Sequence, residues 1–278
     1  MKYGVNLWIG DTPLSSALEV ISKIGFDYCE FSLDYPFPNY VNKKMVNELK
    51  KIKEHGLELG FHGPVYGILL AHPRKEISEA SFRVMKKCIN FASKFNPIYF
   101  NFHQITSTPT LMFNEIKKKI FNQALLTTKE TVRIGKKLKI PITIENNPSP
   151  FFGTPSQFKI VFNKIKKINF CFDIGHVWEC NWAIKQQDTR EPINEKFEFK
   201  DWINQFKKKI FVIHLHDVFV YKNYSPRTHL TLGEGNLDLE KICKTIKRTN
   251  CKYVLIEVFQ KKTYKDLKKN LEFCKSLI

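Results

Sequence analysis

The chain has 278 residues, 43% of them hydrophobic, which is enough for one large core and makes a single domain, residues 1–278, the default expectation. Its formal net charge of +18 suits nucleic acid, an anionic substrate or an acidic membrane face. Lysines in helical stretches supply most of the excess, which favours solvated helix faces over a nucleic-acid reading surface. No stretch approaches the roughly 18 uncharged apolar residues that a membrane-spanning helix needs. Seven cysteines without a C-x-x-C pair indicate a reducing compartment, so we expect a soluble, cytoplasmic protein.

Short β-branched or aromatic runs alternate with longer amphipathic stretches along the whole chain, as buried parallel strands alternate with covering helices. The predicted strands are 3–9, 26–32, 57–62, 97–103, 140–146, 168–175, 210–216 and 252–259. The predicted helices are 13–24, 42–55, 75–95, 113–138, 155–166, 195–208, 238–249 and 263–276. This pattern predicts a single parallel (β/α)8 barrel. The irregular stretches 176–194 and 217–236 are candidate lids or substrate contacts, because loops after barrel strands lie on the catalytic face.

Ionisable residues stand at or near the ends of nearly all these apolar strands. In chain order they are Glu30, His62, His103, Glu145, Asp173 with His176, His214 and Glu257. Taken alone, each has a structural explanation, since a lone strand-end histidine is usually hydrogen-bonded and a lone glutamate is usually half of an ion pair. The parallel strand ends share one rim, however, and the sequence offers almost no arginine or lysine there to neutralise them. Buried charges are costly unless they are paired or metal-bound, so the joint pattern predicts a divalent cation.

The ligand types indicate which ions would bind. Three carboxylates and one imidazole, from Glu145, Asp173, His214 and Glu257, suit manganese, magnesium, cobalt or zinc. His62 and His103 favour zinc, and Glu145 has two carboxylate oxygens with which to bridge two ions. We assign the ligand role on strand seven to His214 and not to His216. Asp217, in the following loop, either orients a ligand or substrate or is a simple turn residue.

Several short motifs carry a resemblance to a known family. They are His62-Gly63-Pro64, Asn101-Phe102-His103, Ile144-Glu145-Asn146, Phe172-Asp173-Ile174-Gly175-His176, His214-Leu215-His216-Asp217, His229 followed by Leu232-Gly233-Glu234-Gly235-Asn236, and Ile256-Glu257. The chain resembles the xylose-isomerase-like barrel superfamily, which contains sugar isomerases, sugar epimerases and the endonuclease IV repair enzymes. The resemblance implies that the tetrad of Glu145, Asp173, His214 and Glu257 holds one ion. In the endonuclease branch His62, His103 and Glu145 would hold a second ion, and His176 with His229 would help to hold a third.

Two departures from the endonuclease pattern favour a small polyhydroxylated substrate. The endonuclease motif has an aspartate two residues before the histidine matched by His229, and here that position is Arg227, whose guanidinium cannot ligate a cation. The second strand ends in acidic Glu30, where the endonucleases carry basic and polar residues that enter DNA. A glutamate there resembles the sugar-active members, in which it could hydrogen-bond a hydroxyl group.

The leading hypothesis is a metal-dependent sugar or sugar-phosphate isomerase or epimerase that works by proton transfer through a metal-stabilised enediolate. Glu145 and Glu257 are the candidate acid/base pair, and His176 would contact a substrate oxygen. Glu30, Asp217 and Arg227 are candidate substrate contacts, with Arg227 facing a phosphate or carboxylate. The alternatives are a zinc-dependent phosphodiesterase acting at abasic sites in DNA and a barrel that binds a ligand without catalysis. The sequence leaves the oligomeric state open.

Overall fold

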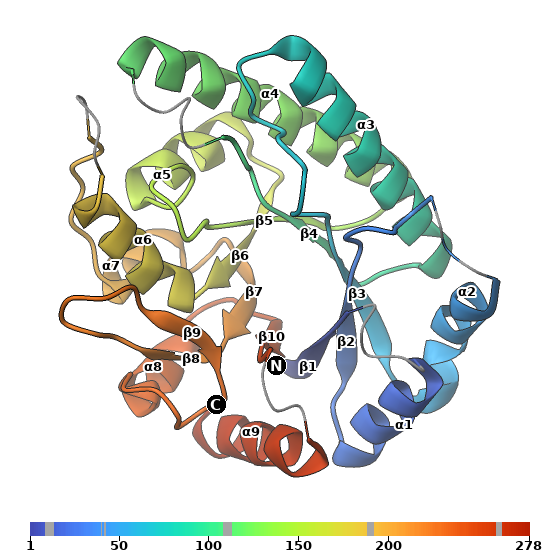
Figure 1. Ribbon diagram of the computed structural model, residues 1–278. Coiled ribbons are helices and arrows are strands. Elements are labelled where there is room, and N and C mark those ends of the chain that lie inside the picture. The colour runs from blue at the N-terminus through green and yellow to red at the C-terminus, as the bar shows by residue number, and fades with distance from the viewer. Residues whose placement is uncertain (9–13, 40, 42, 108–112, 188–191, 260–262) are drawn as a thin grey trace.

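A closed barrel of eight parallel strands forms the centre of the molecule (Figure 1). The computed structural model describes residues 1–8, 14–39, 41, 43–107, 113–187, 192–259 and 263–278. The barrel strands are β1 (Lys2–Leu7), β2 (Tyr28–Ser32), β3 (Glu58–His62), β4 (Phe100–Phe102), β5 (Ile142–Glu145), β6 (Asn169–Asp173), β7 (Ile210–Leu215) and β10 (Tyr253–Ile256). They close in the order β1-β10-β7-β6-β5-β4-β3-β2, which confirms the predicted (β/α)8 architecture.

Helices surround the strands on the outside of the barrel (Figure 1). They are α1 (Leu14–Ile24), α2 (Lys43–Lys50), α3 (Lys75–Ala92), α4 (Asn114–Leu138), α5 (Pro155–Lys164), α6 (Gly175–Lys185), α7 (Phe199–Phe206), α8 (Leu239–Ile246) and α9 (Tyr264–Leu277). Short 3-10 turns, Lys51–His55 and Ser93–Phe95, complete the predicted helices 42–55 and 75–95. The end of the first predicted strand and the start of the first predicted helix fall on 9–13, outside the described residues.

The two stretches expected to be irregular contain regular structure. Helix α6 occupies much of 176–194, and its apolar side chains do not form one buried stripe, since Val177 is buried while Trp178 and Trp182 are only half-buried. The sequence of α6 therefore shows no helical periodicity of apolar residues, and it does not predict a helix there. In 217–236, strands β8 (Asp217–Phe219) and β9 (Arg227–Leu230) pair as an antiparallel hairpin. Both elements follow barrel strands and therefore lie beside the carboxyl-terminal rim.

The hydrophobic core has two parts. The larger part packs the strands against the helices. The smaller part contains Tyr28, Tyr99, Cys171, Val212 and Leu255, all fully buried. Glycines make room for its tyrosine rings, because a Cβ on Gly4 would lie 2.3 Å from the ring of Tyr28 and a Cβ on Gly60 would lie 2.8 Å from that of Tyr99. A packed interior of this kind gives the polar groups above it a rigid floor.

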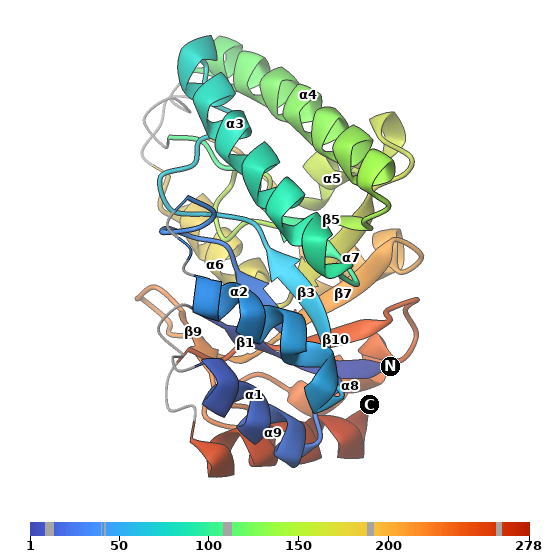
Figure 2. The ribbon, with the colours of Figure 1, turned by 90° about the vertical axis from the view of Figure 1, so that its right-hand side faces the viewer.

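The two ends of the barrel differ. Viewed from the side, both termini lie at one end and the β9 strand lies at the other (Figure 2). Because β1 starts beside the amino terminus and all barrel strands are parallel, the β9 end is the one where the strands terminate. Among the described helices, none combines the length and the apolar character that crossing a membrane requires.

Candidate metal centre

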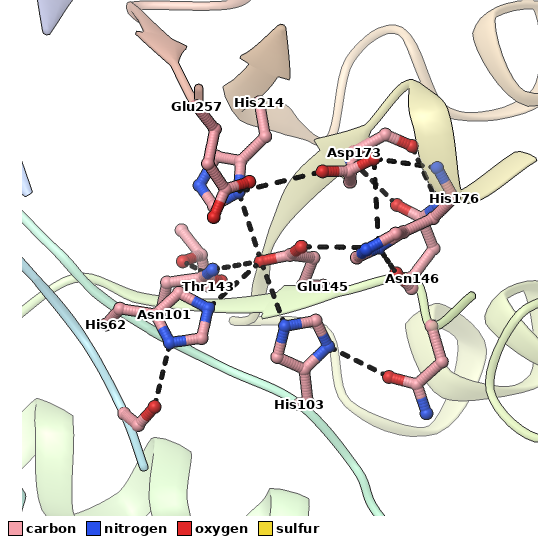
Figure 3. Close-up of polar contacts among 12 residues, drawn as sticks. His62, Asn101, His103, Thr143, Glu145, Asn146, Asp173, His176, His214 and Glu257 are labelled. Atoms are coloured by element: carbon pink, nitrogen blue, oxygen red, sulfur yellow. Dashed lines mark hydrogen bonds and ion pairs between the residues drawn. The ribbon is translucent and has the colours of Figure 1, made fainter. Parts of the chain in front are cut away.

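The ionisable strand-end residues converge in space, with Glu145 in the middle (Figure 3). Within the described residues, two groups match the ligand sets expected from the sequence. One consists of Glu145, Asp173, His214 and Glu257, and the other of His62, His103 and Glu145. In each group the potential ligand atoms all lie within 4.8 Å of one another, and every member is buried. Such spacing allows one cation to contact all members of a group after small side-chain shifts.

Glu145 belongs to both groups and faces four imidazole rings. Its Oε2 lies 3.5 Å from Nε2 of His62, 3.4 Å from Nε2 of His103 and 3.4 Å from Nδ1 of His214. Its Oε1 lies 3.4 Å from Nδ1 of His176. Oε2 therefore lies beside histidines of both ligand sets, and Oε1 faces His176.

A polar pair from adjacent strands holds this carboxylate. Asn101, on β4, donates from Nδ2 to Oε2 of Glu145, and Thr143, on β5, donates from Oγ1 to Oδ1 of Asn101 at 2.9 Å. Both residues are fully buried, so water does not compete for these hydrogen bonds. The chain Thr143–Asn101–Glu145 fixes the orientation of the central carboxylate, in the way that hydrogen bonds around metal ligands commonly do.

The end of β6 and the first turn of α6 place Asp173 and His176 together. Asp173 Oδ1 accepts from the backbone N–H of His176 at 2.8 Å, and Nδ1 of His176 donates to the carbonyl of Asn146 at 2.7 Å. The ring proton on Nδ1 leaves Nε2 free to meet a substrate or cation. Gly175 is required between them, because a Cβ there would lie 1.9 Å from the ring of His216.

One side chain and one backbone carbonyl anchor the rings of His103 and His62. Nδ1 of His103 donates to Oδ1 of Asn147 at 2.9 Å, and Nδ1 of His62 donates to the carbonyl of Gly63 at 2.8 Å. Each ring thus presents Nε2 to Glu145. This is the tautomer and orientation that a histidine ligand needs when its other ring nitrogen is anchored.

His214 sits among carboxylates with both ring nitrogens buried. Its Nδ1 lies 3.0 Å from Oε2 of Glu257, and its Nε2 lies 3.4 Å from Oε2 of Glu30. In the described part of the chain, several buried atoms of the cluster make no hydrogen bond: both ring nitrogens of His214, Oδ2 of Asp173, Oε2 of Glu257 and Oε2 of Glu30. Buried polar atoms that make no hydrogen bond are costly, and here only ion-pair contacts, such as those between His214 and the carboxylates of Glu257 and Glu30, offset that cost. A divalent cation would give the unbonded atoms of Asp173, His214 and Glu257 a partner. The tetrad therefore fits the divalent cation that the sequence predicts.

The electrostatics of the cluster agree with this interpretation. Burial opposes charge on every member, but the facing imidazoles of His103 and His214 hold the pKa of Glu145 well below its usual range. His214 likewise outweighs burial and lowers the pKa of Glu257 to about 2. Although burial disfavours charge on His62, the carboxylates of Glu145 and Glu30 raise its pKa to about 9. The carboxylates are therefore ionised at neutral pH and ready to bind a cation.

His216 also belongs to the cluster, although we assigned the ligand role to His214 alone. Its Nε2 lies 3.3 Å from Oδ1 of Asp173, and it groups with His229 and Glu257 as a further set of potential ligands. Residues two apart on an extended chain share a face, and this signal identifies His216 once His214 is placed inward. His229 has a left-handed φ of 54°, stacks on His216 at 4.2 Å and donates its backbone N–H to Nδ1 of that ring.

The third expected set, His176 with His229, is arranged differently. The two rings are 6.2 Å apart, and the ligand grouping pairs His229 with His216 and Glu257 instead. Burial and the nearby His216 lower the pKa of His229 to about 4.

Glu179, on α6, has an Oε2 that lies 4.0 Å from Nε2 of His176. Sequence reasoning missed this carboxylate because it missed the helix that carries it.

Two of the three predicted substrate contacts lie away from the cavity. Arg227 begins strand β9 with an exposed side chain and is not among the residues that line the cavity. Asp217 is buried and does not line the cavity either. Its Oδ2 accepts from the backbone N–H groups of Gly233 and Gly235, each at 2.9 Å, and its Oδ1 accepts from that of Val218. The carboxylate of Asp217 thus organises the turn after β9, which is the simple turn role left open above.

A cavity of about 410 Å³ opens over the cluster. Its floor includes Glu30, His62, His103, Glu145, His176, His229 and Glu257. Aromatic rings form part of its wall. The ring centroids of Trp8 and Phe259 are 5.5 Å apart in an edge-to-face arrangement, and those of Trp8 and Tyr66 are 6.3 Å apart. Among the described residues that line it, none is lysine or arginine. The cavity thus combines ionisable groups at its base with apolar walls, and its volume is in the range of small-molecule sites.

Comparison with known proteins agrees with this architecture. The sequence profile of the xylose isomerase-like TIM barrel family matches residues 18–277. No curated protein matches the sequence.

Among solved structures, the chain is similar to D-psicose 3-epimerase with D-tagatose from Clostridium cellulolyticum, with a TM-score of 0.74, 13% identity and coverage of 100% of this chain and 99% of that one. A Thermus thermophilus protein soaked with ZnCl2 gives a TM-score of 0.71 and 19% identity, and the match covers 100% and 98% of the two chains. A xylose isomerase-like protein from Mycobacterium smegmatis in complex with magnesium gives 0.67 and 13%, over 97% and 90%. At these identities the likeness shows the fold alone.

Proposed function

Because the chain belongs to the xylose isomerase-like TIM barrel family, we propose that it is a divalent-metal-dependent isomerase or epimerase of a small, uncharged sugar. The observation that carries the proposal is the buried tetrad of Glu145, Asp173, His214 and Glu257, of which Glu145 and Glu257 line a cavity of about 410 Å³. The structural neighbours include proteins described as sugar epimerases, one of them with D-tagatose, which supports the same class of substrate.

The charge of the cavity favours an uncharged substrate over a phosphorylated one. Glu30, Glu145 and Glu257 contribute carboxylates to its lining, and among the described lining residues no lysine or arginine offsets them. Among the described lining residues a phosphate group would find no lysine or arginine to pair with, whereas hydroxyl groups can donate to these carboxylates. The aromatic rings of Trp8 and Phe259 offer apolar surface to the C–H face of a sugar ring.

The chemistry requires a proton to leave one face of a carbon and return to the same or a neighbouring carbon. Glu145 and Glu257 both line the cavity and both belong to the tetrad, so each is placed to accept or return a proton beside a bound carbonyl. His176 also lines the cavity, and because its Nδ1 is held by the carbonyl of Asn146, Nε2 is the ring nitrogen left to contact a substrate oxygen. Glu30, which keeps Oε2 3.4 Å from His214, is placed to orient that ring or to accept from a substrate hydroxyl.

A divalent cation held by Glu145, Asp173, His214 and Glu257 would supply Lewis-acid polarisation of the substrate oxygens. His62 and His103, with the shared Glu145, are placed to hold a second one. The chain's own residues then bind the hydroxyl groups, move the proton and keep water out with the aromatic wall.

The test is solvent isotope exchange at carbon. Protein reconstituted with Mn²⁺, Co²⁺, Mg²⁺ or Zn²⁺ is incubated in D₂O with a panel of free ketoses and aldoses, and proton NMR follows both exchange of the C–H adjacent to the carbonyl and the appearance of a second sugar. Exchange that requires a metal and Glu257 is the expected result. Cleavage of abasic duplex DNA, with no exchange in any sugar, would contradict the proposal and favour the phosphodiesterase.

A further inference from the structure

A cysteine lies directly beneath the metal centre. Cys171 is on β6, two residues before Asp173, so both side chains point into the barrel and Cys171 lies one layer deeper, about 6–7 Å along the strand. It pairs in register with Glu145 on one side and Val212 on the other. The thiol is fully buried and reduced, within the small interior cluster that contains Tyr28 and Leu255.

The thiol faces two members of the tetrad. The sulfur of Cys171, a carboxylate oxygen of Glu145 and a ring nitrogen of His214 all lie within 4.8 Å of one another, and all three residues are buried. Within the described residues, this is the one potential ligand group that includes a cysteine. A second observation also indicates a ligand here: His214 is 0% exposed, and neither of its ring nitrogens makes a hydrogen bond in the described part of the chain.

Two overlapping sets of ligands therefore differ in chemical softness. The upper set adds the carboxylates of Asp173 and Glu257 to the shared Glu145 and His214, which gives mostly oxygen ligands of the kind that magnesium and manganese prefer. The lower set adds the sulfur of Cys171 to the same shared pair, and thiolate ligands select zinc and other soft ions. One imidazole and one carboxylate cannot serve both positions fully, so occupation of one competes with occupation of the other.

We propose that Glu145, Cys171 and His214 form a second, deeper cation position that takes thiophilic ions such as zinc. Binding there replaces the thiol proton of Cys171 by a metal–sulfur bond and releases the proton to solvent, with no change of oxidation state. An ion at this depth draws Glu145 and His214 away from Asp173 and Glu257 at the rim. The position thus sets which metal the centre keeps and places a soft ion further from the cavity than a hard one.

The inference rests on the proposed metal centre but not on the sugar substrate. X-ray absorption at the zinc edge, measured on the full chain loaded with one equivalent of Zn²⁺, distinguishes the ligands directly. We expect one sulfur at about 2.3 Å together with nitrogen and oxygen at about 2.0–2.1 Å. A shell of nitrogen and oxygen alone would overturn the deeper position and leave the upper centre standing. Failure of the protein to bind any divalent ion would overturn both.

A variant locates the sulfur. In Cys171→Ala the sulfur shell should disappear from the zinc spectrum, while affinity for Mn²⁺ stays within about twofold of the wild type, because the upper set is intact. The matched control is Cys29→Ala, which removes a fully buried strand cysteine from the core between strands and helices and should keep the sulfur shell. A sulfur shell that survives in Cys171→Ala would refute the assignment. If that variant does not fold, the wild-type spectrum still decides whether a sulfur binds.

Discussion

Replacing Asn101 by leucine tests whether the hydrogen bonds around Glu145 prepare it to bind a cation. Leucine keeps the branched heavy-atom shape of asparagine, although its methyl groups are bulkier, and it removes the Nδ2 donor to Oε2 of Glu145. A hydrogen bond to a charged group contributes about 1.5–3 kcal/mol. Since 1.4 kcal/mol is a factor of ten, the loss should weaken divalent-metal affinity roughly 10–100-fold.

The assay is a competition titration of Mn²⁺ against a chelating dye, with circular dichroism to confirm the fold. Thr143→Val is the matched control, because it removes only the hydroxyl that donates to Oδ1 of Asn101 at 2.9 Å and leaves the donor to Glu145 in place. We expect a smaller loss of affinity in that variant. An Asn101→Leu protein that binds Mn²⁺ within about twofold of the wild type would refute the positioning role of Asn101.

Three further predictions follow from the site. Glu257→Gln should lower turnover at least about 100-fold with the fold intact, measured by the C–H exchange assay, and retained exchange would remove Glu257 from the mechanism. Asp217→Ala should lower the free energy of unfolding by about 2–3 kcal/mol in urea titrations, because three backbone N–H groups lose a buried acceptor, while metal affinity stays near that of the wild type. In the metal-free protein, the pKa of His62 is raised from 6.5 to about 9, so its stabilising contribution is complete below pH 6.5 and declines by up to about 3 kcal/mol as the pH rises through 9. Urea midpoints between pH 6 and 10 measure this decline, and a flat profile would contradict it.

The barrel and its ring of strand-end ligands were predictable from the sequence for one physical reason. In a parallel barrel every strand terminates at the same rim, so polar residues that follow apolar runs must meet there. That reasoning placed Glu145, Asp173, His214 and Glu257 in one cluster, and the structure brings their ligand atoms within 4.8 Å of one another. His216 and Cys171 were also accessible, since each lies two residues from a predicted ligand and shares its face.

Other parts of the site depend on contacts that a single sequence does not encode locally. The anchoring of His103 by Asn147 depends on which side chains meet across neighbouring loops and strands. Helix α6 has no single apolar stripe, so Glu179 could not be placed beside His176. Asp217 follows a barrel strand, as a catalytic residue would, but its carboxylate turns toward the backbone of 233–235. A residue's position at the end of a barrel strand makes it a candidate for the site, but its role depends on the direction in which its side chain points.

The most direct test of the metal centre is the metal content of the protein. Inductively coupled plasma mass spectrometry on untagged protein, purified without chelator and again after incubation with Mn²⁺ or Zn²⁺, should give at least one ion per chain. The Asp173→Asn and His214→Ala variants should lose that ion, because each removes a member of the buried tetrad. A wild-type protein that holds no divalent ion even after metal is offered would contradict the account and leave a barrel that binds its ligand without metal chemistry.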